Sequence, residues 1–203
     1  DDDEIDPIAF EWKNDFAGKF DVIIGNPPYV RIQEMKNKLE NIGKYFSKIG
    51  YQSATKNFDL SVLFIEKGCK LLSENGKFGY ITTNKFLNAE YGIGIREVIS
   101  KNNLLSKLID FGDQQLFSGA TTYTCLLFLQ KQKKASIKYA QIKNIQKVNK
   151  LLKEIEEKDE INSQDCLLLN IKEDTIDEKP WIFLTKDEQK IFQKIDNFEK
   201  LGN

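Results

Sequence analysis

The sequence contains no histidine among its 203 residues. This absence excludes Ser-His-Asp and Cys-His catalysis within the chain, together with zinc sites that use histidine ligands, and we expect no metal site. Cysteine is scarce, and Cys69, Cys125 and Cys166 lie far apart without a Cys-x-x-Cys pair. We therefore expect reduced, buried thiols in a cytoplasmic protein. No apolar run approaches the length of a membrane span, and no signal peptide is visible.

Methionine occurs only once, as Met35, and the chain opens without it on the acidic run DDDEIDPIAFEW. We therefore expect the sequence to be a fragment of a longer protein. The chain contains 30 Lys and Arg and 31 Asp and Glu, so neither sign of charge is in clear excess. This balance argues neither for nor against nucleic-acid binding, since a basic groove can be offset by acidic residues elsewhere. The length suffices for one domain with a core and an appendage.

Proline is also rare, with four residues, yet two of them adjoin in the stretch FDVIIGNPPYVR, residues 20–31. We expect Val22 to Ile24 to form a buried strand that ends at Gly25. The following residues 26–29, here called the NPPY turn, are stiff, because each proline fixes its own φ and pushes the preceding residue to extended backbone. The stretch therefore presents a rigid polar site at the end of a strand.

The NPPY turn offers two fixed acceptors beside an aromatic ring. The acceptors are the side-chain carbonyl of Asn26 and the backbone carbonyl of Pro27, and the ring is that of Tyr29. If each oxygen accepts one N–H of a planar amino group, the nitrogen is drawn toward tetrahedral geometry and its lone pair can attack an electrophile. No ionised general base is needed. The alternative is an ordinary Pro-Pro loop that closes a core strand.

Helical and strand patterns alternate after this turn. The sequence predicts a helix that begins at Asn57 to Asp59 and stops at Gly76, and then the strand 77–82, the helix 91–100, the strand 104–110 and the strand 123–129. This alternation predicts an α/β domain with a largely parallel sheet. Ligands of such sheets bind at the carboxyl ends of the strands, where Asn26 and the pair Asn84-Lys85 both fall.

Residues 30–56 carry an excess of basic side chains: Arg31, Lys36, Lys38, Lys44, Lys48 and Lys56 against Glu34 and Glu40. A long insertion directly after a strand-end site is typical of a lid or a substrate-gripping element. Phosphate contact and a solvated helix remain the two interpretations, and Arg31 is the best phosphate candidate. Phe117, in a polar loop, is either a plug over the core or a second wall, with Tyr29, of a slot for one flat base.

Four stretches of the chain carry a resemblance to a known family. In chain order they are FDVIIGNPPYVR, DLSVLFIEKGCKLL, GKFGYITTNKFLNAEYGIGIREVI and LFSGATTYTCLLFL. Together they resemble the catalytic domain of restriction-associated DNA adenine-N6 methyltransferases. The resemblance is greatest to the fused type II restriction–modification enzymes. It implies that residues 1–130 form the later half of a Rossmann-like methyltransferase sheet, mostly parallel with one antiparallel strand. Residues 131–203 would be a mixed α+β extension toward a target-recognition domain that the chain lacks. The implied substrate is an adenine flipped out of double-stranded DNA.

The same resemblance assigns roles to single residues. Asn26 and Pro27 would bind the adenine amino group and border the cofactor S-adenosylmethionine, Tyr29 would stack on the base, and Phe117 would take the opposite or edge contact. From the residues themselves we also expect Pro28, Arg31, Asn84 and Lys85 to bind the substrate. The family's Gly-rich cofactor turn and its acidic residues are not found ahead of Phe20, and Gly92 and Gly94 are not that turn. We therefore expect the chain alone to be inactive. The alternatives are a protein-glutamine or RNA amino-methyltransferase and a non-catalytic DNA-binding remnant.

Overall fold

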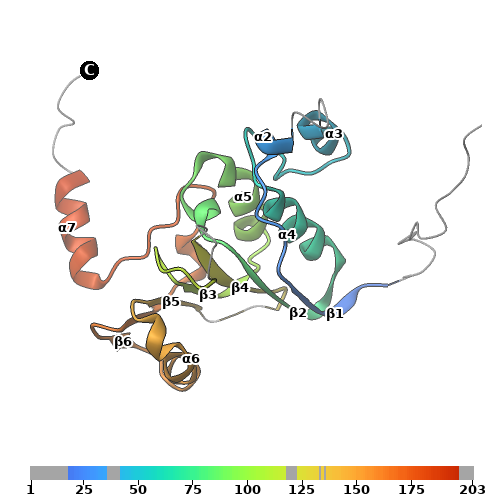
Figure 1. Cartoon of the computed structure of the whole chain (residues 1–203). Coiled ribbons are helices and arrows are strands. Elements are labelled where there is room, and N and C mark those ends of the chain that lie inside the picture. The colour runs from blue at the N-terminus through green and yellow to red at the C-terminus, as the bar shows by residue number, and fades with distance from the viewer. Residues whose placement is uncertain (1–17, 36–41, 118–122, 133, 135, 197–203) are drawn as a thin grey trace, which may run out of the picture.

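The computed structural model describes residues 18–35, 42–117, 123–132, 134 and 136–196 (Figure 1). The first elements are β1 (Phe20–Gly25), α2 (Ile32–Met35), α3 (Ile42–Lys48), α4 (Leu60–Leu71), β2 (Leu72–Thr83), α5 (Ile93–Lys101), β3 (Leu105–Asp110) and β4 (Thr124–Gln130). They are followed by β5 (Ile137–Ile142), α6 (Val148–Glu157), β6 (Ile161–Asn162), β7 (Cys166–Ile171) and α7 (Lys186–Asp196). Two short 3-10 turns, η1 (Lys85–Leu87) and η2 (Glu90–Gly92), connect β2 to α5. No helix in these ranges is both long and apolar enough to cross a membrane.

Seven strands form one sheet in the order β1-β2-β4-β3-β5-β7-β6. β1 is parallel to β2 and β3 is parallel to β5, whereas β4 runs antiparallel to both of its neighbours. Among the described strands up to Gln130, β4 is thus the single antiparallel one. The predicted α/β class is confirmed. β5 extends this sheet beyond Gln130, and β7 then pairs antiparallel with both β5 and β6.

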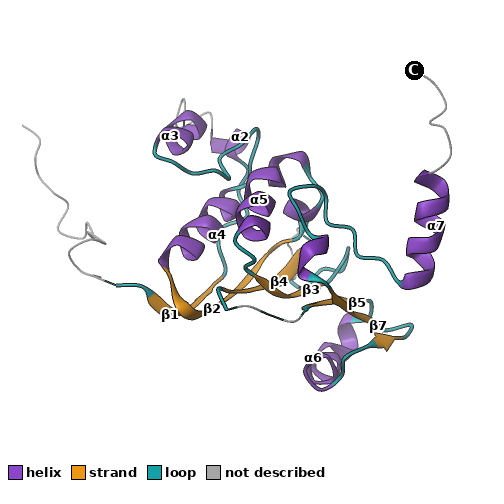
Figure 2. Ribbon diagram, turned by 180° about the vertical axis from the view of Figure 1, so that it is seen from behind, coloured by secondary structure: helices purple, strands orange, loops and turns teal. Residues whose placement is uncertain are grey.

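Helices cover both faces of the sheet (Figure 2). α4 and α5 lie on one face and α6 lies on the other. Apolar residues at helical spacing explain this packing, because α4 buries Val62 and Ile65 and α5 buries Ile95 and Ile99 against the main core. A smaller cluster lies under α6, which buries its apolar stripe. The three cysteines are free and buried, as the sequence predicts.

Two expectations from the sequence are wrong. The strand before the NPPY turn is not buried, since Val22 is 61% exposed and Ile24 is 82% exposed. Val22 and Ile24 point to the face of this edge strand opposite Ile23, and only the Ile23 side packs against the main core. The helix α4 ends at Leu71 rather than at Gly76, since Leu72 already has extended backbone and pairs with Phe20. Gly76 therefore lies inside β2.

The other expected elements are confirmed with shifts of a few residues at their ends. Residues 145–157 form a 3-10 turn followed by α6. α7 begins after Thr185, whose hydroxyl accepts a hydrogen bond from the backbone N–H of Glu188, while the Glu188 carboxylate accepts from Thr185. This reciprocal arrangement is a capping box. α7 stands apart from the sheet (Figure 1), at the end of an extended segment.

Candidate functional site

The NPPY turn and Asn84 lie at the same edge of the sheet. The NPPY turn directly follows β1, and Asn84 directly follows β2. β1 and β2 are parallel neighbours in which Gly25 pairs with Tyr80, so their carboxyl ends adjoin. Gly25 permits this approach, because a Cβ atom there would lie 2.7 Å from the ring of Tyr80. The structure thus brings together the two polar strand ends singled out in the sequence.

Tyr29 and Asn26 are joined by a hydrogen bond within the NPPY turn. The Tyr29 hydroxyl donates to Asn26 Oδ1 at 2.6 Å and also lies 3.2 Å from the carbonyl oxygen of Ile81. Burial raises the pKa of Tyr29 to about 12, with smaller contributions from Cys125 and Asp59, so the hydroxyl keeps its proton at neutral pH. An amide oxygen has two lone pairs. Asn26, which is exposed, therefore retains the capacity to accept a second hydrogen bond.

Pro27 supplies a second acceptor. The residue is buried, yet its carbonyl oxygen accepts no hydrogen bond from any residue that the structure describes. Buried backbone carbonyls are nearly always paired. An unpaired carbonyl directly beside the Asn26 amide is therefore available to an external donor.

Asn84 has a structural role at this edge. Its side-chain nitrogen donates to Asp110 Oδ1 at 2.8 Å and to the carbonyl of Gly112 at 3.1 Å, so both amide hydrogens are used. These bonds tie the end of β2 to the end of β3. Only the side-chain oxygen of Asn84 remains for a substrate. Lys85 begins η1, and its ammonium group forms no ion pair within the described ranges.

The remaining predicted substrate residues are placed differently. Pro28 and Arg31 are exposed beside the site, and the Arg31 guanidinium has no ion-pair partner among the described residues. Phe117 is 42% exposed and is the last described residue before residue 123. No ring contact joins it to Tyr29 within the described part of the chain. The predicted slot between these two rings therefore stays a prediction. Lys36 and Lys38 lie outside the described residues.

Sequence reasoning missed Arg96, a buried cation beside the site. Arg96 is 2% exposed, and its guanidinium donates to the carbonyls of Phe86 at 2.6 Å, Ala89 at 2.9 Å and Glu178 at 2.9 Å. It thereby ties the turn after β2 to the segment that leads to α7. Gly92 makes room for it, since a Cβ there would lie 2.5 Å from the Arg96 guanidinium. A charged residue inside the apolar stripe of α5 is the signal that could have identified it.

Glu66 is a second buried charge that the sequence reading missed. Its side chain is 1% exposed, on the face of α4 that packs into the core. It accepts hydrogen bonds from the backbone of Gln52 and from the backbone and hydroxyl of Ser53, and it forms an ion pair with Lys70. Glu66 therefore anchors Gln52 and Ser53, which belong to the insertion between the NPPY turn and α4.

One carboxylate at a described strand end bears on the binding of a nucleoside cofactor. Ribose hydroxyls are usually bound by a free carboxylate at the end of a strand. Asp110 is the carboxylate at the end of β3; its Oδ1 accepts hydrogen bonds from Asn84 and from the backbone of Gly112, whereas its Oδ2 accepts none from the described residues. A cavity of about 840 Å³ lies elsewhere, between β7 and the segment before α7, with Leu169 and Trp181 in its wall.

Comparisons with known proteins agree with the resemblance noted in the sequence. A family profile described as Eco57I restriction-modification methylase matches residues 2–117, more than half of the chain. The chain is 43% identical over 129 residues to the type II restriction enzyme and methyltransferase RM.Eco57I of Escherichia coli, a match that covers 64% of this chain and 13% of that enzyme. It is 33% identical over 124 residues to the type II methyltransferase M.BstVI of Geobacillus stearothermophilus, covering 60% of this chain and 21% of that protein. The chain thus spans less than a quarter of the length of these two relatives.

Solved structures share the fold. The methyltransferase subunit of a type I restriction-modification system from Streptococcus thermophilus superposes with a TM-score of 0.56 and 16% identity, over 79% of this chain and 36% of that one. The type IIG restriction endonuclease BpuSI gives a TM-score of 0.56 and 18% identity, over 76% of this chain and 19% of that one. At this identity the likeness concerns the fold, and it confirms the expected methyltransferase sheet.

Proposed function

The chain belongs to the Eco57I restriction-modification methylase family, and we propose that it supplies the amine-binding half of the active site of a DNA adenine-N6 methyltransferase. The observation that carries this proposal is the pair of acceptors after β1. Asn26 Oδ1 keeps a free lone pair, and the Pro27 carbonyl accepts nothing from the described residues. Both belong to a turn whose backbone the prolines stiffen, at the edge of the sheet where α/β folds bind their ligands.

The two acceptors act on the amino group of the base. Each accepts one N–H hydrogen of the adenine amine, which fixes the group and withdraws the nitrogen lone pair from the ring. The oxygens are in place before the reaction begins, so little reorganisation accompanies the transition state. Tyr29 positions Asn26 through its hydroxyl and offers its ring face to the base. Stacking of this kind offsets part of the free energy needed to unstack a base from a duplex.

We propose S-adenosylmethionine as the methyl donor, which when bound would supply an electrophilic methyl group. Asn26 and Pro27 would border it, but the sequence ahead of Phe20 carries no Gly-rich turn of the kind that binds such a cofactor. We therefore expect the 203-residue chain to bind S-adenosylmethionine with a Kd above about 1 mM, as measured by isothermal titration calorimetry. Saturable binding at micromolar concentration would contradict the view that most of this pocket lies outside the described residues.

A methyl-transfer assay tests the proposal. The natural full-length protein is incubated with labelled S-adenosylmethionine and duplex DNA, and the product nucleosides are identified by mass spectrometry. We expect N6-methyladenine, and we expect Asn26→Ala to lower kcat by about a hundredfold or more, the order found when one preorganised polar group is removed from an active site. Asn149→Ala is the matched control, because Asn149 is exposed on α6.

Each outcome of this assay has a defined meaning. Undiminished activity in Asn26→Ala would remove the central mechanism. N4-methylcytosine as the product would keep the amine-binding site but exclude adenine as the substrate. Parallel reactions with RNA and with a glutamine-containing peptide test the two other amino-group substrates, and methylation of either of these without methylation of DNA would overturn the proposal.

A further inference from the structure

The insertion after the NPPY turn leaves the sheet and returns to it at one point. Leu60 N donates to the Val30 carbonyl at 2.8 Å, and Ile32 N donates to the Phe58 carbonyl at 3.0 Å. These two hydrogen bonds close the insertion into a loop whose base directly follows the NPPY turn. We call residues 42–58 of this loop the arm. The base of the arm is therefore fixed relative to the NPPY turn.

The arm is basic in a chain that is otherwise balanced in charge. Its seventeen residues contain no Asp or Glu and three lysines, Lys44, Lys48 and Lys56. Lys56 forms an ion pair with Glu90, whereas Lys44 and Lys48 are exposed and form no ion pair within the described ranges. The two lie four residues apart on α3, so they share one face of the helix. Like charges at this spacing destabilise a helix unless an anion lies between them.

Apolar surface accompanies these two lysines. Tyr45 is 59% exposed and Ile49 is 51% exposed, and they follow Lys44 and Lys48 in the sequence. The opposite side of the arm is packed, because Phe58 is 1% exposed and contributes to the main core. An exposed tyrosine beside two lysines without ion-pair partners among the described residues fits a polymer that carries phosphates together with flat bases.

Side chains of α4 hold the arm in place. Ser53 donates to the buried carboxylate of Glu66 through its N–H at 2.8 Å and its hydroxyl at 2.6 Å. Burial opposes ionisation of Glu66, but hydrogen bonds from Lys70, Ser53 and Gln52 outweigh it and lower the pKa, so the carboxylate stays charged. Lys70 also donates to the Gly50 carbonyl at 3.0 Å and lies 4.7 Å above the Tyr51 ring.

α5 packs against the same part of the arm. A Cβ atom at Gly94 would lie 2.3 Å from the carbonyl oxygen of Gln52, so the glycine is needed for this close approach. The Thr55 hydroxyl also donates to the carbonyl of Tyr91. The arm is thus wedged between α4 and the start of α5. In Figure 1, α3 lies on the side of α4 and α5 that faces away from the sheet, and α6 lies at the opposite end of the molecule.

We propose that the arm lies along the sugar-phosphate backbone of duplex DNA, beside the base held at Asn26. Lys44 and Lys48 bind neighbouring phosphates, and Tyr45 lies against a sugar or base edge. This inference rests on the proposed function, and it adds the part of the chain that holds the duplex during base extrusion. The contacts are to the backbone, so they position the DNA without selecting its sequence.

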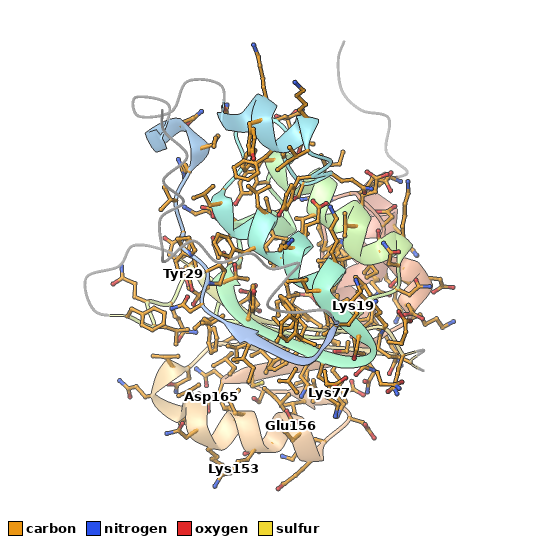
Figure 3. All side chains as sticks on the ribbon, turned by 90° about the vertical axis from the view of Figure 1, so that its right-hand side faces the viewer. Lys19, Tyr29, Lys77, Lys153, Glu156 and Asp165 are labelled. Carbon is orange, nitrogen blue, oxygen red and sulfur yellow. The ribbon has the colours of Figure 1, made fainter. Side chains whose placement is uncertain are left out.

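Salt-dependent binding tests the arm. The natural full-length protein and its Lys44→Ala/Lys48→Ala variant are titrated against a fluorescent target duplex at several salt concentrations, with circular dichroism to verify the fold. Each phosphate contact contributes about 0.9 to the slope of log K against log salt, so the double variant should lose about two from that slope. The matched control is Lys150→Ala/Lys153→Ala on α6, where both lysines are exposed and Lys153 lies away from Tyr29 (Figure 3).

A second variant separates the uncharged contact from the charged ones. Tyr45→Ala should lower affinity by a similar factor at every salt concentration and leave the slope unchanged. If the double lysine variant has the slope of the control while the wild type still methylates DNA, the arm proposal is overturned and the proposed function stands. If the wild type neither binds nor methylates duplex DNA, the proposed function itself fails. Unchanged affinity in Tyr45→Ala would remove the tyrosine from the interface.

Discussion

Tyr29 combines two roles that one substitution can separate. Its hydroxyl donates to Asn26 Oδ1 at 2.6 Å, and its half-buried ring lies directly after the two prolines. The hydroxyl orients the Asn26 amide, while the ring face is the surface on which a base can stack. Phenylalanine retains the second property and loses the first.

We predict different effects for Tyr29→Phe and Tyr29→Ala. Tyr29→Ala should weaken binding of an extruded base by about 1–3 kcal/mol, the range for base–aromatic stacking. Tyr29→Phe should keep base binding near the wild-type level and lower kcat, because Asn26 loses the donor that orients it. The measurements are the fluorescence of 2-aminopurine at the target position, which reports extrusion, and single-turnover methylation. Equal loss of extrusion in both variants would contradict the stacking role.

Buried tyrosines predict how stability changes at high pH. Burial raises the pKa of Tyr29 to about 12 and also raises the pKa of Tyr91 and Tyr139 above the ordinary value of 10.0. Above that value the unfolded chain releases these protons first, so the free energy of unfolding falls as pH rises. Below pH 10 the full stabilisation is present. Urea unfolding at pH 8 and at pH 11 measures the difference, and Tyr139→Phe should make the decline shallower. A free energy that stays flat over this range would contradict the prediction.

Local sequence patterns single out some residues of the candidate site and miss others for one physical reason. Asn26, Pro27 and Tyr29 are neighbours, so their restraint and chemistry can be inferred from local rules. Glu66 and Arg96 act on backbone groups far away in the chain, because Arg96 binds the carbonyl of a residue 82 positions later. Periodicity shows that a charge falls on an apolar face, but it does not show which carbonyl or N–H will meet that charge.

At the scale of elements, the contact between α5 and the arm depends on one glycine. Gly94→Ala would place a methyl group 2.3 Å from the carbonyl of Gln52, which is backbone and cannot move aside easily. We expect a loss of about 1–3 kcal/mol in the free energy of unfolding, as for overpacking in a core. Backbone amides of Gln52 and Ser53 should exchange with solvent faster, as measured by hydrogen exchange. Lys101→Ala, at the exposed end of α5, is the control. Slow exchange retained in Gly94→Ala would show that the arm does not rest on α5.

Elements were predicted best where one face is clearly apolar. α4, α5, β3 and β4 follow from their 3.6- or 2-residue patterns. The end of α4 was missed because Gly76 suggested a helix stop, whereas pairing with Phe20 draws Leu72 into the sheet. β6 and β7 were not predicted either. β6 has two residues, and its pairing with β7 is a tertiary effect that local propensity does not reveal.

At the scale of the whole molecule, the position of β1 at the edge of the described sheet has a direct consequence. An edge strand with exposed apolar side chains, such as Val22 and Ile24 in β1, can pair with another chain. We predict that the 203-residue chain self-associates through β1 at high concentration. Ile24→Lys should reduce this association, as measured by sedimentation velocity over a range of concentrations. Ile191→Lys on α7 is the control, because Ile191 is also exposed, at 59%. An equal effect of both substitutions would indicate general solubility rather than pairing at β1.

Sequence patterns could not have placed β1 at the edge of the sheet. The run Val22-Ile23-Ile24 has the apolar character of a strand buried on both faces of a parallel sheet. Strand order depends on pairings between distant segments, and periodicity within one strand carries no information on its neighbours. The α/β class was predictable because it depends only on the alternation of elements along the chain.

The guanidinium of Arg96 has a consequence for motion as well as for stability. It is planar and rigid, and it holds Glu178 on one side and the turn after β2 on the other. A displacement of the segment before α7 must tilt this plane and so pull on the residues that follow Asn84. Trp181 adds a second link between the same two segments, since its backbone N–H donates to the Leu87 carbonyl at 2.8 Å, so a movement of α7 would reach the turn after Asn84 along two routes.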